Sequence, residues 1–134
     1  MEVRIIVAGC RDFTNYTRIK SELDIFINFL YRSGFKKSDI LLISGGAKGV
    51  DSFAERYAKE NHFKMKCFQA DWDKYGRAAG PIRNEAMAKY ATNDGFCASY
   101  LYAFWDRKSR GTKNMIETAK RYKIPVTVID IKGE

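Results

Sequence analysis

Short apolar runs alternate with amphipathic stretches along the whole chain. The apolar runs have the length of β-strands, and we expect strands at 3–8, 40–44, 64–68, 98–105 and 125–131. The stretches between them carry apolar residues at helical spacing, which predicts helices at about 16–31, 51–60, 81–90 and 112–122. In the first helix one face is formed by Ile19, Leu23, Phe26, Ile27 and Leu30.

Strands that alternate with helices are typical of βαβ units and a parallel sheet. The sequence therefore predicts the α/β class: a single Rossmann-like, three-layer domain over 1–134, with helices on both faces of a five-stranded, mainly parallel sheet. The simplest strand order is 3-2-1-4-5, with 64–68 at an edge because its residues alternate. The polar segment 69–80 is expected to be a long loop, and Pro81 fits the first turn of the next helix.

Ligands of such sheets bind beyond the carboxyl ends of the strands, near the point where strand order reverses. The loops after the first, second and fourth strands are thus expected to meet there. The first loop offers Gly9, Cys10 and Arg11. A glycine lets the backbone approach a ligand, and an arginine fork suits a phosphate, although a turn glycine followed by a surface arginine is the plain alternative.

The second loop is rich in glycine and leads into a helix. Gly45, Gly46 and Gly49 surround Lys48, so exposed backbone N–H groups, a helix N-terminus and a cation come together as in an anion cradle. The spacing is neither that of a Walker motif nor that of the dinucleotide fingerprint. Asp51 is either a ligand contact or the acid that caps the following helix.

The fourth-strand loop is basic and also leads into a helix. Arg107, Lys108 and Arg110 lie within four residues, and like charges so close together are better explained by a phosphate than by folding. A solvated loop is the alternative. Other candidate ligand contacts in or beside this loop are Trp105, Ser109, Gly111 and Thr112. Thr112 is a candidate helix cap as well as a phosphate donor.

The segment 69–80 and the helix after it add aromatic, acidic and basic residues. Trp72 is suited to stack on a base, and Asp71 or Asp73 to bind sugar or base donors. Packing of Trp72 against its own loop is an equal alternative. Arg83 and Asn84 begin the next helix and are further ligand candidates.

Composition narrows the class of partner. The 134 residues carry 24 Lys plus Arg against 16 Asp plus Glu, a formal charge of +8, which favours anionic partners without choosing between a nucleotide and a polynucleotide. Three separate cysteines without a CxxC pair, and the single His62, indicate no disulfide framework and no metal site. We expect no cofactor beyond the ligand. The N-terminus lacks a signal peptide and no membrane span appears, so a cytoplasmic location is expected.

The ordered set of motifs resembles the YspA/YpsA-like branch of the SLOG superfamily. The matching residues run over nearly the whole chain as 9–13, 45–51, 71–72, 80–84, 104–106 and 109–112. The resemblance implies a Rossmann-like fold and a nucleotide-type or ADP-ribose-like ligand in a bacterial or phage protein. Related superfamily members are the Lonely Guy phosphoribohydrolases, which release a base from a nucleoside monophosphate, and DNA-processing protein A, which binds single-stranded DNA.

Two positions depart from the related patterns. Cys10 stands where the branch usually has serine, and a thiol is a weak hydrogen-bond donor. Met115 stands where the Lonely Guy motif has its glutamate, with Glu117 two residues later. The resemblance thus implies that the ligand-holding arginine, Arg83, is kept while a catalytic carboxylate is missing or moved.

Three hypotheses follow, ranked in this order. The first is a sensor or sequestering protein that binds the ligand intact. The second is a nucleotide N-glycosidase, with catalytic candidates Arg83, Asp73 and Glu85, and with Asp51 and Asp106 as further carboxylates. The third is a single-stranded nucleic-acid binder. Homo-oligomers are common in the superfamily, and Phe26, Phe29 and Tyr31 are candidates for an interface or for the core.

Overall fold

A five-stranded sheet in the order β3-β2-β1-β4-β5 forms the centre of the protein. The computed structural model describes residues 1–93, 95 and 97–134. The strands are β1 (Val3–Gly9), β2 (Ile40–Ser44), β3 (Lys64–Cys67), β4 (Ala98–Trp105) and β5 (Val126–Asp130). Each adjacent pair is parallel, and Val3 of β1 aligns with Ile40 of β2 and Ala98 of β4. The predicted fold class and strand order are confirmed.

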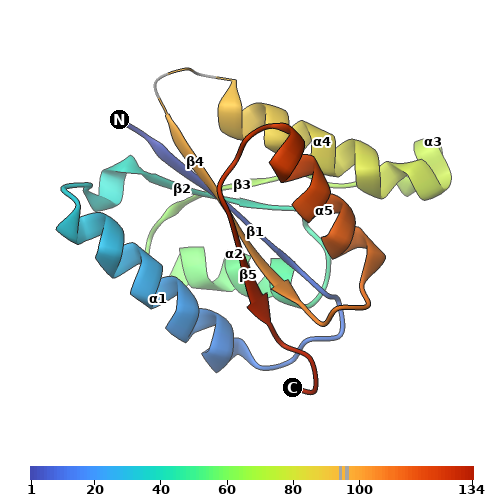
Figure 1. Cartoon of the computed structure of the whole chain (residues 1–134), viewed down its shortest axis with the longest axis horizontal. Helices are drawn as coiled ribbons and strands as arrows, with labels where there is room; N and C mark the ends of the chain where they lie inside the picture. The colour runs from blue at the N-terminus through green and yellow to red at the C-terminus, as the bar shows by residue number, and fades with distance from the viewer. Residues whose placement is uncertain (94, 96) are drawn as a thin grey trace.

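Two helices cover each face of this sheet (Figure 1). One face carries α1 (Tyr16–Arg32) and α2 (Val50–Glu60), and the other carries α4 (Ala79–Thr92) and α5 (Arg110–Arg121). Three short turns complete the set: η1 (Lys37–Asp39), α3 (Trp72–Tyr75) and η2 (Gly76–Ala78). Among the described residues, no helix combines the length and the apolar character that crossing a membrane requires.

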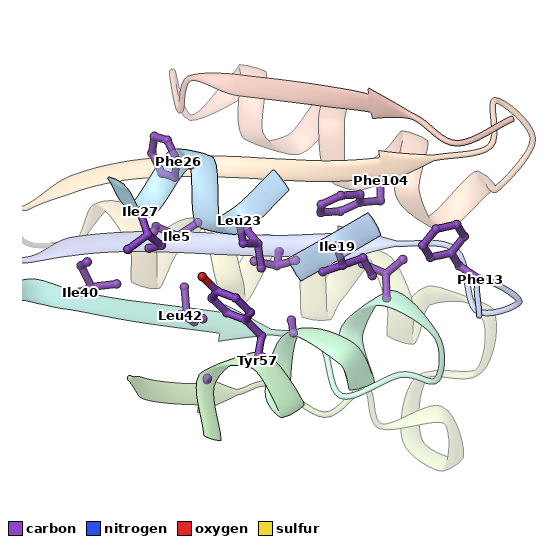
Figure 2. Packing of buried hydrophobic residues seen from close by; sticks show 14 of the residues in the cluster. Ile5, Phe13, Ile19, Leu23, Phe26, Ile27, Ile40, Leu42, Tyr57 and Phe104 are labelled. Atoms are coloured by element: carbon purple, nitrogen blue, oxygen red, sulfur yellow. The ribbon is translucent and has the colours of Figure 1, made fainter. Parts of the chain in front are cut away.

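The central strand β1 contributes side chains to both layers of the core. Val3, Ile5 and Val7 belong to the cluster under α1 and α2, whereas Ile6 and Ala8 belong to the cluster under α4 and α5. This alternation follows from the two-residue period of a strand. Figure 2 shows the first cluster, with Phe13, which lies in the loop after β1, at one end. The core therefore anchors the start of that loop.

Helix α1 buries the face that its spacing predicts. Its buried residues are Ile19, Leu23, Phe26, Ile27 and Leu30. Asn15 caps its N-terminus by accepting a hydrogen bond from the backbone N–H of Arg18 at 3.2 Å. Phe26 belongs to the core, whereas Phe29 and Tyr31 are 52% and 39% exposed. Of the three aromatic residues predicted to lie in an interface or in the core, only Phe26 is a core residue.

The segment 69–80 differs from the unstructured loop expected there. It contains α3 and η2, and α4 already begins at Ala79. Asp71 nucleates α3 because its side chain accepts the backbone N–H of Lys74 at 3.1 Å. Pro81 is therefore the third residue of α4, where a missing N–H costs no intrahelical hydrogen bond. Turns this short carry no hydrophobic period from which they could be predicted.

Helix α5 also begins earlier than expected, at Arg110. Ser109, with extended backbone angles, is its N-cap residue, although its side chain makes no capping bond. Thr112 consequently lies inside the first turn and is not the cap. Its hydroxyl is 3.1 Å from the hydroxyl of Ser109.

Candidate functional site

A cleft of about 770 Å³ opens at the carboxyl ends of the strands, within the usual size range of small-molecule sites. Residues from the β1–α1 loop, the start of α2, the α3–α4 segment and the β4–α5 loop line it. The predicted ligand residues that line the cleft are Gly9, Cys10, Arg11, Asp51, Trp72, Arg83, Asn84, Ser109, Arg110, Gly111 and Thr112. The structure thus brings the first and the fourth-strand loops together at the cleft, where the loop after β2 contributes Ala47.

The remaining predicted residues do not line this cleft. They are Gly45, Gly46, Lys48, Gly49, Asp71 and Trp105, together with the catalytic candidates Asp73 and Glu85. Lys48 and Asp73 are exposed. Glu85 forms an ion pair with Arg121 on α5, with the charged atoms 3.2 Å apart. Trp105 donates from its indole nitrogen to the carbonyl oxygen of Ser109 at 3.0 Å, which braces the β4–α5 loop.

Gly49 supports the site through its backbone. It has a φ of +71°, a region that side-chain-bearing residues rarely adopt. This conformation brings the loop against the backbone of Cys10, whose carbonyl oxygen accepts the N–H of Val50 at 3.3 Å. Gly49 therefore joins the β1 and β2 loops, instead of lining the ligand space.

Arg83 is the charged side chain most firmly held in the cleft. Its Nε donates to Oδ1 of Asn84 at 2.9 Å, and its Nη1 donates to the carbonyl oxygen of Gly45 at 2.5 Å. Burial lowers its pKa from the ordinary value, and the nearby Asp51 carboxylate acts in the opposite direction. A half-buried guanidinium fixed at two of its nitrogens is well placed to hold an anion.

Asn84 links Arg83 to helix α5. Its side chain is buried, and its Nδ2 donates to Oδ1 of Asn114 at 2.9 Å and to the carbonyl oxygen of Gly111 at 3.3 Å. A chain of hydrogen bonds therefore runs from α5 through α4 to the loop after β2.

Asp51 is a buried carboxylate at the wall of the cleft. It lies in the first turn of α2, whose N-cap is Gly49, and its Oδ2 accepts the N–H of Ala47 at 3.2 Å. Burial raises its pKa to about 6, although the Ala47 N–H and the charge of Arg83 lower it. Asp51 thus combines both predicted features, because it is a first-turn acid that also faces the ligand space.

The β4–α5 loop is shaped by Asp106. Its Oδ1 accepts the backbone N–H groups of Ser109 at 2.8 Å and Lys108 at 2.9 Å. These bonds hold the Asp106 pKa below its ordinary value. The turn directs the chain into α5, whose first N–H groups have no partners within the helix. This end of the cleft is suited to an anion.

The short helix α3 adds an aromatic side chain to the wall of the cleft. Trp72 is 48% exposed, and the guanidinium carbon of Arg11 lies 5.4 Å from the centre of its ring. Tyr75, one turn along α3, is also exposed but does not line the cleft. An exposed indole at the wall of a cleft offers a stacking surface for a flat ring.

Cys10 lines the cleft with a neutral thiol. It is buried, and its pKa is raised by burial and by the charge of Asp106. A protonated thiol is a weak donor, so the contribution of this position comes from its backbone and shape. Among the described residues, no group of three or more His, Cys, Asp or Glu side chains is arranged to hold a metal ion.

Sequence reasoning missed several cleft residues. Arg77 and Asn114 are the main ones, with Asp12, Ala47, Gly80, Pro81, Met87 and Met115 beside them. Arg77 could not be predicted as a cleft residue, because it lies in the short turn η2, whose sequence has no recognisable pattern. Asn114 is detectable only through its position one turn after Gly111 on α5, next to α4.

A second, more basic pocket of about 520 Å³ lies at the other end of the sheet. It is lined by Lys36, Lys37, Ser38, His62 and Lys64, which lie just before β2 and at the start of β3. Two of its lysines have contacts within the protein: Lys64 donates to the carbonyl oxygen of Ser38 at 3.1 Å, and Lys37 lies over the ring of Phe63. This pocket faces away from the carboxyl ends of the strands, so we place the functional site in the larger cleft.

Comparison with known proteins agrees with the fold. The model of a family described as YAcAr, the YspA, cpYpsA-related SLOG family, matches residues 3–75. The "Gene 61 protein" of Mycobacterium phage D29 is 28% identical over 128 residues, which cover 92% of this chain and 93% of that protein.

Two solved structures share the architecture. DNA processing protein A (DprA) from Streptococcus pneumoniae aligns with a TM-score of 0.65 at 18% identity, over 95% of this chain and 50% of that one. The protein TM1055 aligns with a TM-score of 0.60 at 15% identity, over 94% of this chain and 72% of that one. The chain thus spans half the length of DprA, and at these identities the likeness is one of fold.

Proposed function

Because the chain belongs to the YspA, cpYpsA-related SLOG family, we propose that it binds a phosphorylated nucleotide or an ADP-ribose-like molecule in this cleft, as a sensor or sequestering protein. Family membership supports nucleotide-related binding or processing in general. The choice of an intact ligand rests on Met115, which occupies the position of the Lonely Guy glutamate and is buried in the core.

The charge of the cleft carries the proposal. Five basic side chains line it: Arg11, Arg77, Arg83, Lys108 and Arg110. Three carboxylates oppose them, and Asp106 already uses one oxygen to accept two backbone N–H groups. The excess of positive charge in a concave site attracts a phosphorylated molecule. The start of α5 suits its phosphate, and Trp72 suits its base.

The test is thermal unfolding of the protein with AMP, ADP-ribose, NAD and cyclic nucleotides, followed by mass spectrometry of the recovered molecules. A ligand at a hundredfold excess over its Kd stabilises the fold by about 2.7 kcal/mol. We expect stabilisation by at least one phosphorylated molecule, which is recovered intact. Arg83→Ala should lower the stabilisation to about 1.4 kcal/mol at the same ligand concentration, because a tenfold weaker Kd leaves a tenfold excess. Lys48→Ala, outside the cleft, should leave the stabilisation unchanged. No stabilisation by any member of the panel contradicts the proposal.

A nucleotide N-glycosidase is the second candidate, and the observation that favours it is Asp51. Its buried carboxylate, with a pKa raised to about 6, is suited to stabilise a developing positive charge or to position a water. Asp73 and Glu85 lack this position in the cleft, so Asp51 is the carboxylate to test with Arg83. Release of free adenine from AMP, lost in Asp51→Asn, supports this candidate, and full turnover by that variant excludes Asp51.

A nucleic-acid ligand remains the third candidate. The net charge of +8 favours it, as does the similarity of the fold to DNA processing protein A. Contacts to many phosphates release counterions, so such binding weakens steeply with salt. Affinity for a single-stranded oligonucleotide that falls by several powers of ten between about 50 and 200 mM salt supports it. Affinity that hardly changes excludes it.

A further inference from the structure

We propose that Asn84 is a positioning residue, which fixes the direction in which Arg83 meets an anion, and not a residue whose own donors bind the ligand. This inference rests on the proposed function, because it concerns the same cleft. It assigns different tasks to two neighbouring residues that the sequence places together as ligand contacts.

The amide of Asn84 already has protein partners for its donors. The residue is 3% exposed, and its Nδ2 donates to Oδ1 of Asn114 and to the carbonyl oxygen of Gly111. An amide nitrogen has two N–H groups, so both are in use. Its Oδ1 accepts Nε of Arg83 at 2.9 Å. A ligand acceptor would have to displace one of the two bonds that the amide nitrogen donates.

Arg83 is held at two points of its guanidinium plane. Nε is bound by Asn84, and Nη1 is bound by the carbonyl oxygen of Gly45. These contacts stop rotation of the planar group and leave the N–H groups of Nη2, with the second one of Nη1, for an anion. Because the fork is ordered beforehand, less conformational entropy is lost when an anion binds.

The same amide sets the spacing between two anion-binding elements. Through Gly111 and Asn114, Asn84 is joined to the N-terminal part of α5, and both of these residues line the cleft. The first N–H groups of a helix have no acceptor within it. Among the described residues, the amide nitrogen of Asn114 has no acceptor, so it can donate to a ligand in the cleft. Asn84 thus couples the Arg83 fork to the N-terminus of α5.

The binding test uses AMP and adenosine as probes, with wild type, Asn84→Ala, Arg83→Ala and the double variant. We expect each single substitution to weaken AMP about tenfold, which is about 1.4 kcal/mol. Adenosine, which lacks the phosphate, should bind all variants equally. The double variant should bind AMP no more weakly than Arg83→Ala, since Asn84 acts through Arg83. A further tenfold loss in the double variant, or an equal loss for adenosine, overturns the assignment.

A second measurement does not depend on any ligand. We expect the Nε–H proton of Arg83 to exchange slowly with water in NMR spectra of the wild type and at least about tenfold faster in Asn84→Ala. If that variant does not fold, Asn84→Asp keeps the acceptor for Nε and removes the two donors. This variant should retain slow exchange of the Arg83 Nε–H proton and still lose affinity for AMP. The added negative charge offsets the positive charge of the Arg83 guanidinium, and the hydrogen bonds from residue 84 to α5 are lost.

The two readouts separate the possible failures. Unchanged Nε–H exchange in Asn84→Ala, or unchanged AMP affinity in Asn84→Asp, overturns the role of Asn84 while the proposed function stands. A wild type that binds no member of the panel of AMP, ADP-ribose, NAD and cyclic nucleotides overturns the proposed function, whatever the exchange rates are.

Discussion

Gly45 lies between two charged side chains that come from different helices. A Cβ atom built at Gly45 would be 2.7 Å from Nη1 of Arg83 and 2.9 Å from Oδ2 of Asp51. Arg83 belongs to α4 and Asp51 to α2, on opposite faces of the sheet. Because Gly45 has no side chain, the guanidinium of Arg83 and the carboxylate of Asp51 can both lie close to the end of β2. Gly45 serves the site by this close approach, although it does not line the cleft.

We expect Gly45→Ala to displace Arg83 and to weaken AMP binding at least about tenfold. The new methyl group meets the guanidinium, and overpacking of this kind costs about 1–3 kcal/mol of folding free energy. Urea unfolding and AMP titration measure the two effects. Gly111→Ala is the control for stability, because nothing lies within 4 Å of a Cβ at that position. Equal stability of wild type and Gly45→Ala would contradict the packing that we describe.

Trp72→Ala should weaken a nucleotide by about 1–3 kcal/mol, the range for loss of base stacking on an aromatic side chain. The stability of the fold should hardly change, since the indole is 48% exposed. Titration calorimetry with AMP measures the first effect and thermal unfolding the second. Tyr75→Ala removes an exposed ring of the same short helix outside the cleft, so it should bind AMP like wild type. If both variants bind equally well, Trp72 is not the stacking surface.

Asp51 should make the fold less stable as pH rises. Its pKa is raised from 3.8 to about 6, so the folded protein keeps a proton that the unfolded chain has released. The stabilisation by this group is therefore full below about pH 4 and is lost as pH rises through 6, by about 3 kcal/mol in total. Asp51→Asn does not titrate. Relative to wild type, the variant should gain about 3 kcal/mol in unfolding free energy between pH 4 and 7, measured with urea, and parallel curves would disprove the shift.

Asp106 should act on the shape of its loop through hydrogen bonds more than through charge. Asp106→Ala leaves the N–H groups of Lys108 and Ser109 without their acceptor and should cost about 1 kcal/mol. Asp106→Asn retains an acceptor oxygen and should keep most of the stability and of the AMP affinity. Thermal unfolding of the two variants compares these effects. Equal losses in Asp106→Asn and Asp106→Ala would show that the charge is the important feature, because both variants remove it and only Asp106→Asn keeps an acceptor.

The strand order and the core faces are predictable because both follow from local pattern. Buried parallel strands such as β2 are continuous apolar runs, and α1 shows its period over four turns. The α3–η2 segment is not predictable in this way, because each turn is too short for a period and depends on the single cap Asp71. Helix α4 begins at Ala79, two residues before the predicted start, because the end of a helix likewise depends on single residues and not on a period.

The site is predictable at the level of loops and less so at the level of side chains. Parallel topology brings the loop ends together, so Arg11, Arg83 and Ser109 are expected and found at one cleft. The direction of each side chain depends on tertiary contacts that the sequence does not display. Glu85 is on the same helix as Arg83 but forms an ion pair with α5, whereas the buried carboxylate that lines the cleft is Asp51 of α2.

Arg77 and Lys48 show where the predicted and the observed cleft residues differ. The glycine-rich loop makes Lys48 the expected phosphate ligand, yet Lys48 is exposed outside the cleft, whereas Arg77 of η2 lines it. We expect Arg77→Gln to weaken AMP about threefold to tenfold and Lys48→Gln to leave its affinity unchanged at physiological salt, since a charge beyond the cleft is screened within about 8 Å. Titration at two salt concentrations measures both. The reverse order of effects would place the phosphate over the β2–α2 loop, and the anion cradle that the glycines suggest would then be the binding site.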